Sequence, residues 1–325
     1  MKVIEKLRVA SDEDRTIFSF EFLTPRPKED LEKLMSTIDG MVSHGPSFCD
    51  LTWRPGGLEA DLTLKVSGKM QNEVGVETLL HLAVTGMTME MIDHALDTAK
   101  AKGINNILAL KGDPVKGKDP AQDPLQCALD LVKYIRAKHG DYFGIAVAGY
   151  PEAHPCMKPE GSEVATEEGY QSDLEYLKKK VDAGADLIIT QLFFDTDAFL
   201  KFVGDCRQIG ISCPIIPGIL AISTHRNLAY MTKMCKPKIP KEMKDALELV
   251  KDDEEALMKY GIQMGTEMCR KILAHGIKTL HFYTINKERA ALAILKNLGL
   301  VSDNENTKSL EGGVQNHTGS NGTIH

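Results

Sequence analysis

Long hydrophobic runs are missing from this 325-residue sequence. No stretch of about 18 consecutive apolar residues occurs, which excludes a membrane-spanning helix. The N-terminus, from Met1 to Lys6, lacks the apolar core of a secretory signal, so we expect a cytoplasmic protein. Positive charge is also scarce, because 39 Lys and Arg face 46 Asp and Glu, a net charge of −7. This acidic balance argues against a general nucleic-acid binder, which needs cations to neutralise phosphates.

Several short motifs that mark common active sites are absent. The seven cysteines are scattered without a CxxC pair, which fits free thiols in a reducing compartment better than a zinc ribbon or a thioredoxin-type site. No HExxH or HxxxH spacing joins the histidines, so we expect no metal centre. The GxGxxG, GxxxxGK[ST] and GxSxG patterns are missing too, which leaves a Rossmann site, a P-loop and an α/β-hydrolase without support. A dinucleotide can still bind through helix N-termini and backbone amides.

A repeated rhythm of short apolar runs and longer amphipathic stretches organises the chain. Several short runs are continuously apolar, as in 187–194, and such runs suit parallel strands covered on both faces. The eight predicted strands are Ile17–Phe22, Phe48–Thr52, Glu77–Ala83, Asn106–Leu110, Gly144–Gly149, Asp186–Phe193, Pro214–Ile219 and Thr279–Thr284.

Helices are predicted between these strands, where apolar residues recur at helical spacing. Each of the clearest examples stops shortly before a glycine, which supplies a left-handed cap. The stretch 228–275 is expected to hold two or three helices, interrupted at Pro237 and Pro240. The clearest helices are Met89–Lys102, Asp123–His139, Asp173–Ala183 and Phe199–Gln208.

Eight successive β-then-α units predict an α/β protein with a (β/α)8 TIM barrel, with extra helices between strands seven and eight. A doubly wound sheet is the alternative, because periodicity alone does not establish closure. We assign residues 1–301 to the barrel. Residues 302–325 are rich in Asn, Gly, Ser and Thr, and we predict a disordered polar tail because they bury too little apolar surface to fold.

The chemistry of such a barrel is expected at the C-terminal ends of its strands. Glu21 stands out there, because it lies between Phe20 and Phe22 and an apolar pocket would raise its pKa. It is either a general acid or a carboxylate held in a salt bridge. Asp113 follows a glycine and precedes a proline, which suits a ligand contact or an ordinary Asx turn. Gln191 needs a partner, either a ligand or neighbouring backbone.

Further polar side chains fall at or beyond strand ends without a motif of their own. His81 suits a ligand contact or a satisfied core histidine, and His154 suits a site or an exposed loop. Lys180 is the member of a lysine run that is nearest a strand, and it could reach a phosphate. Strand eight presents Tyr283, followed by Lys287.

Eight segments together resemble one enzyme family. They are 18–22 (FSFEF), 49–53 (CDLTW), 77–82 (ETLLHL), 108–114 (LALKGDP), 147–151 (VAGYP), 183–186 (AGAD), 190–194 (TQLFF) and 281–284 (HFYT). In this order they resemble methylenetetrahydrofolate reductase, and its plant-type branch most of all, over roughly residues 1–300. Each motif is modest alone, but the ordered set is highly specific.

This resemblance implies a barrel that holds FAD non-covalently and works by a ping-pong reaction. NADH or NADPH would pass a hydride to the flavin, and the folate would then take it, so that 5,10-methylenetetrahydrofolate becomes 5-methyltetrahydrofolate. The small-molecule partners are thus a reduced folate and a nicotinamide dinucleotide. The family also suggests a homo-oligomer. The chain stops after the barrel and tail, so we do not expect regulation by the S-adenosylmethionine-binding domain of eukaryotic members.

The resemblance also assigns roles to individual positions. Glu21 resembles the general acid that opens the folate ring to an iminium, and Asp113 the carboxylate that stabilises this cation. Gln191 and Tyr283 match folate contacts, and His225 and Lys287 fall at substrate-side positions. The positions that match flavin contacts are Thr52, Trp53, His81, Lys111, Gly112, Asp113, Ala128, Tyr150, His154, Asp173 and Lys180.

Some residues depart from the family pattern, and they cluster on the folate side. Lys111 replaces an arginine and so loses the planar guanidinium fork. Ala221 replaces a common proline, His225 a stacking aromatic and Lys287 a substrate-binding arginine. Two other functions therefore stay open: a paralogue that reduces a different iminium with the same flavin, and a weakly active barrel that serves as a binding or regulatory subunit.

Overall fold

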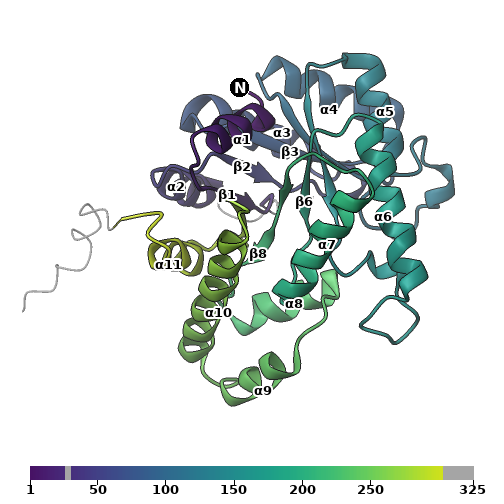
Figure 1. Cartoon of the computed structure of the whole chain (residues 1–325). Helices are drawn as coiled ribbons and strands as arrows, with labels where there is room; N and C mark the ends of the chain where they lie inside the picture. Colours follow the sequence, from purple (N-terminus) through teal and green to yellow (C-terminus); the bar gives the residue numbers. More distant parts are fainter. Residues whose placement is uncertain (26–30, 303–325) are drawn as a thin grey trace, which may run out of the picture.

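The computed structural model describes residues 1–25 and 31–302, and within them nine strands form one parallel sheet (Figure 1). Their order is β7-β6-β5-β4-β3-β2-β1-β9-β8. The strands are β1 (Ile17–Phe22), β2 (Phe48–Leu51), β3 (Thr78–Ala83), β4 (Asn106–Leu110), β5 (Gly144–Gly149), β6 (Leu187–Thr190), β7 (Ile215–Ile216), β8 (Gly218–Leu220) and β9 (Thr279–Tyr283).

The two edges of this sheet, β7 and β8, are successive parts of one predicted strand, 214–219. Pro217 separates them, because proline has no N–H to donate to a neighbouring strand. β7 pairs with β6, and β8 pairs with β9, so this divided seventh strand joins the two edges of the sheet and closes it into a ring. The carbonyl of Pro217 accepts the His281 N–H at 3.1 Å. The (β/α)8 barrel is confirmed, and its seventh strand is divided into the two short strands β7 and β8.

Helices follow most strands and cover the outside of the barrel. Those of the described residues are α1 (Val3–Asp12), α2 (Leu31–Val42), α3 (Ala60–Lys69), α4 (Met89–Ala101), α5 (Ala128–His139), α6 (Glu167–Asp182), α7 (Thr196–Gln208), α8 (His225–Cys235), α9 (Lys241–Leu249), α10 (Glu254–Ala274) and α11 (Arg289–Asn297). Three of them, α8, α9 and α10, fill the long stretch before the last strand, as predicted. None of the helices in the described residues is long and apolar enough to cross a membrane.

Three helices begin elsewhere than the sequence predicts. α5 starts at Ala128 rather than Asp123, because Pro124 biases the preceding residue away from helix and Asp123 is extended (φ −64°, ψ 136°). α6 starts at Glu167 rather than Asp173, because the Thr166 hydroxyl accepts the Gly169 N–H at 3.0 Å and caps an earlier turn. α7 starts at Thr196 rather than Phe199, because the Asp195 side chain accepts the N–H groups of Asp197 and Ala198 and caps an earlier turn.

α1 closes the end of the barrel where the strands begin. Its buried face, which includes Val3, Ile4 and Leu7, packs in one apolar cluster with strand residues such as Phe48 and Leu79. The Val3 N–H also donates to the Asn106 side chain at 2.7 Å. Figure 1 shows α1 far from α8 and α9, which lie beyond the other end of the strands. Among the described residues, α1 therefore covers the end of the barrel opposite to α8 and α9. The predicted tail lies, from residue 303 onward, outside the described residues.

Candidate active site

A cavity of about 1710 Å³ occupies the C-terminal end of the barrel. All but one of the predicted site residues line it. They are Glu21, Thr52, Trp53, His81, Lys111, Gly112, Asp113, Ala128, Tyr150, His154, Asp173, Lys180, Gln191, Tyr283 and Lys287. Residues that lie far apart in the sequence thus meet in one place, because the strands are parallel and end together.

His225 is the exception. It is the first residue of α8, and its neighbours Thr224 and Arg226 line the cavity while His225 does not. Its backbone N–H donates to the Glu254 carboxylate at 3.0 Å, and its Nδ1 lies 3.4 Å from the same side chain. The structure therefore gives His225 a contact with α10 instead of a place in the cavity wall.

Glu21 presents its carboxyl group to this cavity from β1. The side chain is only 12% exposed, and its nearest ionic neighbour is the His81 Nε2, 3.6 Å away. Burial raises the pKa of Glu21 to about 8; the charge of His81 opposes this shift and that of Asp50 adds to it. At neutral pH the carboxyl group is therefore protonated, which is the state that a general acid requires.

Asp50 and His81 form a buried pair beside Glu21. The His81 Nε2 donates to Asp50 Oδ2 at 2.9 Å. Burial by itself lowers the pKa of His81, but the hydrogen bond and the charge of Asp50 outweigh it and the pKa is raised. Donor atoms of Glu21, Asp50 and His81 lie within 4.8 Å of one another. The hydrogen bond joins two of these three residues, His81 and Asp50, and Glu21 adjoins His81.

A buried cation lies in another part of the wall. Lys180 of α6 is 4% exposed; its ammonium group donates to the Ala148 carbonyl at 2.7 Å and lies 5.1 Å from the centre of the Tyr176 ring. Burial lowers its pKa to about 8, while the Asp173 carboxylate opposes the shift. Burial likewise raises the pKa of Asp173, whose carboxylate accepts the His154 N–H at 3.2 Å. This polar wall suits an anionic group.

The turn after β4 brings Lys111, Gly112 and Asp113 to the exposed rim of the cavity. Gly112 has φ +90°, and a Cβ there would lie 2.7 Å from the Ala83 Cβ, so the turn requires glycine. Burial, followed by the charges of Glu21 and Asp113, raises the pKa of the Cys235 thiol to about 12. Cys235 therefore lies within electrostatic range of both predicted catalytic carboxyls.

Two predicted substrate contacts have defined partners. The Tyr283 hydroxyl donates to the Thr190 carbonyl at 2.6 Å, which fixes the ring against the cavity. Gln191 follows β6, and its side-chain oxygen accepts the Leu192 N–H at 2.8 Å, which leaves the amide NH2 as a donor for a ligand. Lys287 lines the rim and is exposed.

Sequence reasoning missed one wall of the cavity. α8 contributes Arg226, Asn227, Tyr230, Met231 and Met234. The position of α8 directly after the seventh strand pointed to the cavity. A helix with one polar and one apolar face, however, usually packs on the outside of a barrel. At the rim, the Asn286 side chain makes two hydrogen bonds to the Leu23 backbone, at 2.8 and 3.1 Å, and joins the ends of β9 and β1.

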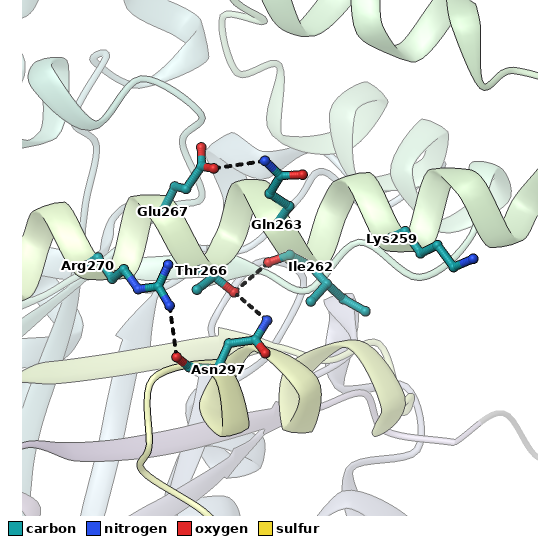
Figure 2. A pocket seen from close by; sticks show the side chains of 7 residues that line it. All are labelled: Lys259, Ile262, Gln263, Thr266, Glu267, Arg270 and Asn297. Atoms are coloured by element: carbon teal, nitrogen blue, oxygen red, sulfur yellow. Dashed lines mark hydrogen bonds between the residues drawn. The ribbon is translucent and has the colours of Figure 1, made fainter.

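A second depression, of about 250 Å³, lies on the outside of the barrel between α10 and α11 (Figure 2). Most of its polar groups are paired within the described residues, and Lys259 is the exception. Gln263 donates to Glu267 at 3.0 Å, Arg270 to the Asn297 carbonyl at 3.0 Å, and the Asn297 amide to the Thr266 hydroxyl at 3.2 Å. Since these groups are satisfied, the barrel mouth is the better candidate for a site.

A (β/α)8 barrel with a large cavity, a protonated acid and a buried cation is typical of an enzyme, with room for a cofactor and a substrate. Residues 6–299 match the family model of methylenetetrahydrofolate reductase. The chain belongs to this family, as its motifs indicated.

Individual relatives agree with this assignment. "Methylenetetrahydrofolate reductase (NADH) 1" of Zea mays is 58% identical over 314 residues, which are 95% of this chain but 53% of the maize protein. The chain thus spans about half the length of this relative. "5,10-methylenetetrahydrofolate reductase" of Pectobacterium carotovorum is 33% identical over 296 residues, which cover 91% of this chain and 94% of the bacterial one.

A solved structure confirms the fold. An uncharacterized protein from Clostridium thermocellum that binds two copies of 5-methyl-5,6,7,8-tetrahydrofolic acid has a TM-score of 0.59. It is 13% identical in sequence, and the match covers 90% of this chain and 98% of that one. At this identity the likeness concerns the fold alone.

Proposed function

We propose that this protein is an FAD-dependent reductase that converts 5,10-methylenetetrahydrofolate to 5-methyltetrahydrofolate with NADH or NADPH. The observation that carries the proposal is Glu21, a buried carboxyl group with a pKa of about 8 at the mouth of a barrel of this family. Ring opening of the folate needs a proton donor at neutral pH, and Glu21 is in the required state.

The residues of the cavity fit a flavin dinucleotide. Trp53 is buried, and its indole N–H has no hydrogen-bond partner within the described chain, so the wall holds a donor that a ligand can satisfy. Lys180 and Lys111 place positive charge on the wall and the rim, where a diphosphate would be bound. The volume of about 1710 Å³ accommodates a dinucleotide and a second reactant.

The bound flavin would accept a hydride from the nicotinamide and supply it to the substrate carbon. The protein's own groups do the rest. Glu21 gives its proton to the bridging nitrogen of the folate as the carbon–nitrogen bond breaks, and the substrate becomes an iminium cation. Asp113 at the rim supplies the negative charge that stabilises this cation. Gln191 and Tyr283 orient the pterin, since both line the same wall.

A ping-pong sequence is consistent with the single large cavity. Every predicted cofactor and substrate residue except His225 lines the same space, so the nicotinamide and the folate would use it in turn. The maize relative's name specifies NADH, which supports a nicotinamide as electron donor. The cytoplasmic location and the homo-oligomeric state expected from the sequence stay predictions.

A second candidate is a paralogue that reduces a different imine. It is favoured by Lys287, which lines the cavity where the family has an arginine, and by His225, whose contact is with Glu254 instead of the cavity. Ala221 is buried in the core and does not line the cavity. On α8 the half-exposed Tyr230 and Met234 offer an apolar surface to a substrate of other shape. A regulatory barrel without activity is less well supported, because Glu21, Asp113 and Gln191 all line the cavity together.

The test is to purify the protein and measure its visible spectrum before and after incubation with FAD. A yellow protein that NADH or NADPH bleaches, and that methylenetetrahydrofolate re-oxidises, supports the proposal. A protein that stays colourless after FAD addition refutes the flavin. A protein that is bleached but not re-oxidised by the folate refutes the substrate and favours the paralogue.

A further inference from the structure

A row of buried polar side chains runs behind Glu21, deeper in the barrel. Asp50, His281 and Ser19 are each 0% exposed, and His81 is 5% exposed. They come from four neighbouring strands, and the register sets Glu21 beside Asp50 and Ser19 beside His281. Burying polar groups costs stability unless they are hydrogen-bonded, and the proposed reaction assigns no step to any of these four residues.

One ring nitrogen in this row faces two carboxyl groups. The His81 Nε2 lies 2.9 Å from Asp50 Oδ2 and 3.6 Å from Glu21 Oε2. A ring nitrogen carries a single hydrogen, and only the shorter distance is that of a hydrogen bond. The hydrogen of His81 is therefore held by Asp50, and the Glu21 carboxyl group makes no hydrogen bond within the described residues.

A second imidazole, that of His281, also lies near Asp50. The Ser19 hydroxyl lies 2.8 Å from the His281 Nδ1, and if it donates there, the Nε2 is left as the N–H. That Nε2 lies 3.5 Å from Asp50 Oδ2 and makes no hydrogen bond within the described chain. Asp50 Oδ1 has no hydrogen-bond partner within the described chain. A fully buried carboxylate with one unpartnered oxygen is poorly explained by stability alone.

We infer that Asp50 is a positioning residue, which binds the His81 N–H and so keeps that donor away from Glu21. Deprived of a donor, the Glu21 carboxylate is not stabilised, and the carboxyl group retains the proton that ring opening consumes. This inference rests on the proposed function for its use in the reaction, but the hydrogen-bond competition exists without substrate.

The other charged groups around Glu21 do not change this conclusion. The titratable groups that face it are Asp50 on β2, His81 on β3, Tyr283 on β9 and Cys235 on α8. Burial, with charges that include those of Glu21 and Asp50, raises the pKa of Tyr283. Burial also raises the pKa of the Cys235 thiol, so both side chains are neutral at pH 7. His81 is the one hydrogen-bond donor of this set whose release stabilises the Glu21 carboxylate.

The test compares three substitutions at Asp50 in the full chain. Asp50→Ala and Asp50→Leu remove the acceptor; the leucine also fills the space, so a cavity does not confound the result. Asp50→Asn removes the charge but keeps a side-chain oxygen that accepts the His81 N–H, and it is the matched control. The readout is the infrared band of the protonated Glu21 carboxyl group, identified by subtraction of the Glu21→Gln spectrum and titrated with pH.

We expect the Glu21 pKa to fall by about one unit or more in Asp50→Ala and Asp50→Leu, because His81 turns its N–H to the carboxylate. It should fall by less in Asp50→Asn, because this variant loses only the charge of Asp50 and keeps the acceptor for the His81 N–H. An equal fall of the Glu21 pKa in all three variants would show that Asp50 acts by its charge alone. An unchanged Glu21 pKa in all three would show that Asp50 has a structural role only. Either result overturns the inference.

This titration needs no folate and no nicotinamide, so it is independent of the proposed function. If the wild-type protein fails to re-oxidise with the folate, the proposed function is wrong, while the titration still decides the role of Asp50. If the folate reaction proceeds, its alkaline limit should move to lower pH in Asp50→Leu.

Discussion

Two buried ionisable side chains in the cavity have pKa values displaced toward neutrality, one from each side of the scale. Burial raises the pKa of Glu21 and lowers that of Lys180, each to about 8. Both groups therefore lose a proton in the same pH range. Their prominence in the sequence differs, since Glu21 is flanked by phenylalanines and could be singled out, whereas Lys180 is one of three lysines and was identified by its position near a strand.

Lys180 allows a prediction about pH. In the folded protein its pKa is about 8, below the ordinary 10.5, so the unfolded chain binds more protons between these values and stability rises as the pH increases through that range. Lys180→Met should remove this dependence and stabilise the apoprotein at pH 7, with the gain vanishing near pH 10.5. Thermal unfolding between pH 7 and 10.5 measures it, and Lys179→Met on the exposed face of the same helix is the control.

The same substitution should weaken flavin binding. Hydrogen bonds to charged groups contribute about 1.5–3 kcal/mol, so Lys180→Met should raise the Kd for FAD by roughly 10- to 150-fold, while Lys179→Met leaves it unchanged. Fluorescence titration with FAD measures both variants. Equal affinity in the two would mean that Lys180 does not contact the phosphates.

Among the elements, strands were easier to predict than helix starts. Apolar runs such as that of β6 indicate buried parallel strands by composition, and the sequence predicted all eight strands of the barrel. The start of α6 depends on a cap made by Thr166. The break at Pro217 depends on the pairing of β7 with β6 and of β8 with β9. Such details arise from single hydrogen bonds, which a periodic pattern does not contain.

The short strand β8 provides a prediction about barrel closure. A Cβ on Gly218 would lie 2.3 Å from the Thr190 carbonyl oxygen and 2.5 Å from the Tyr283 ring, both rigid neighbours. Gly218→Ala should therefore lower stability by about 1–3 kcal/mol and displace the tyrosine that faces the cavity. In α7, a Cβ on Gly204 would meet no neighbouring side chain within 4 Å, so Gly204→Ala should instead stabilise the protein by about 0.5–1 kcal/mol. Urea unfolding of both variants decides the matter; a neutral Gly218→Ala would contradict the described packing.

For the whole molecule, the barrel and most of the cavity wall followed from the sequence, because parallel strands carry their terminal residues to one end. Fifteen of the predicted residues line the cavity for this reason. The α8 wall and the pairing of Asp50 with His81 did not follow, since they depend on which side chains meet across strands and on a helix that returns over the barrel.

The central claim is that Glu21 donates the proton for ring opening, and separate half-reactions of the Glu21→Gln variant test it most directly. The account predicts that flavin reduction by NADH stays within about threefold of wild type, while re-oxidation by methylenetetrahydrofolate slows by about 10²–10⁴-fold, the usual contribution of a general acid. Glu13→Gln, on the exposed surface, is the control. Folate-dependent re-oxidation at the wild-type rate in Glu21→Gln would contradict the account.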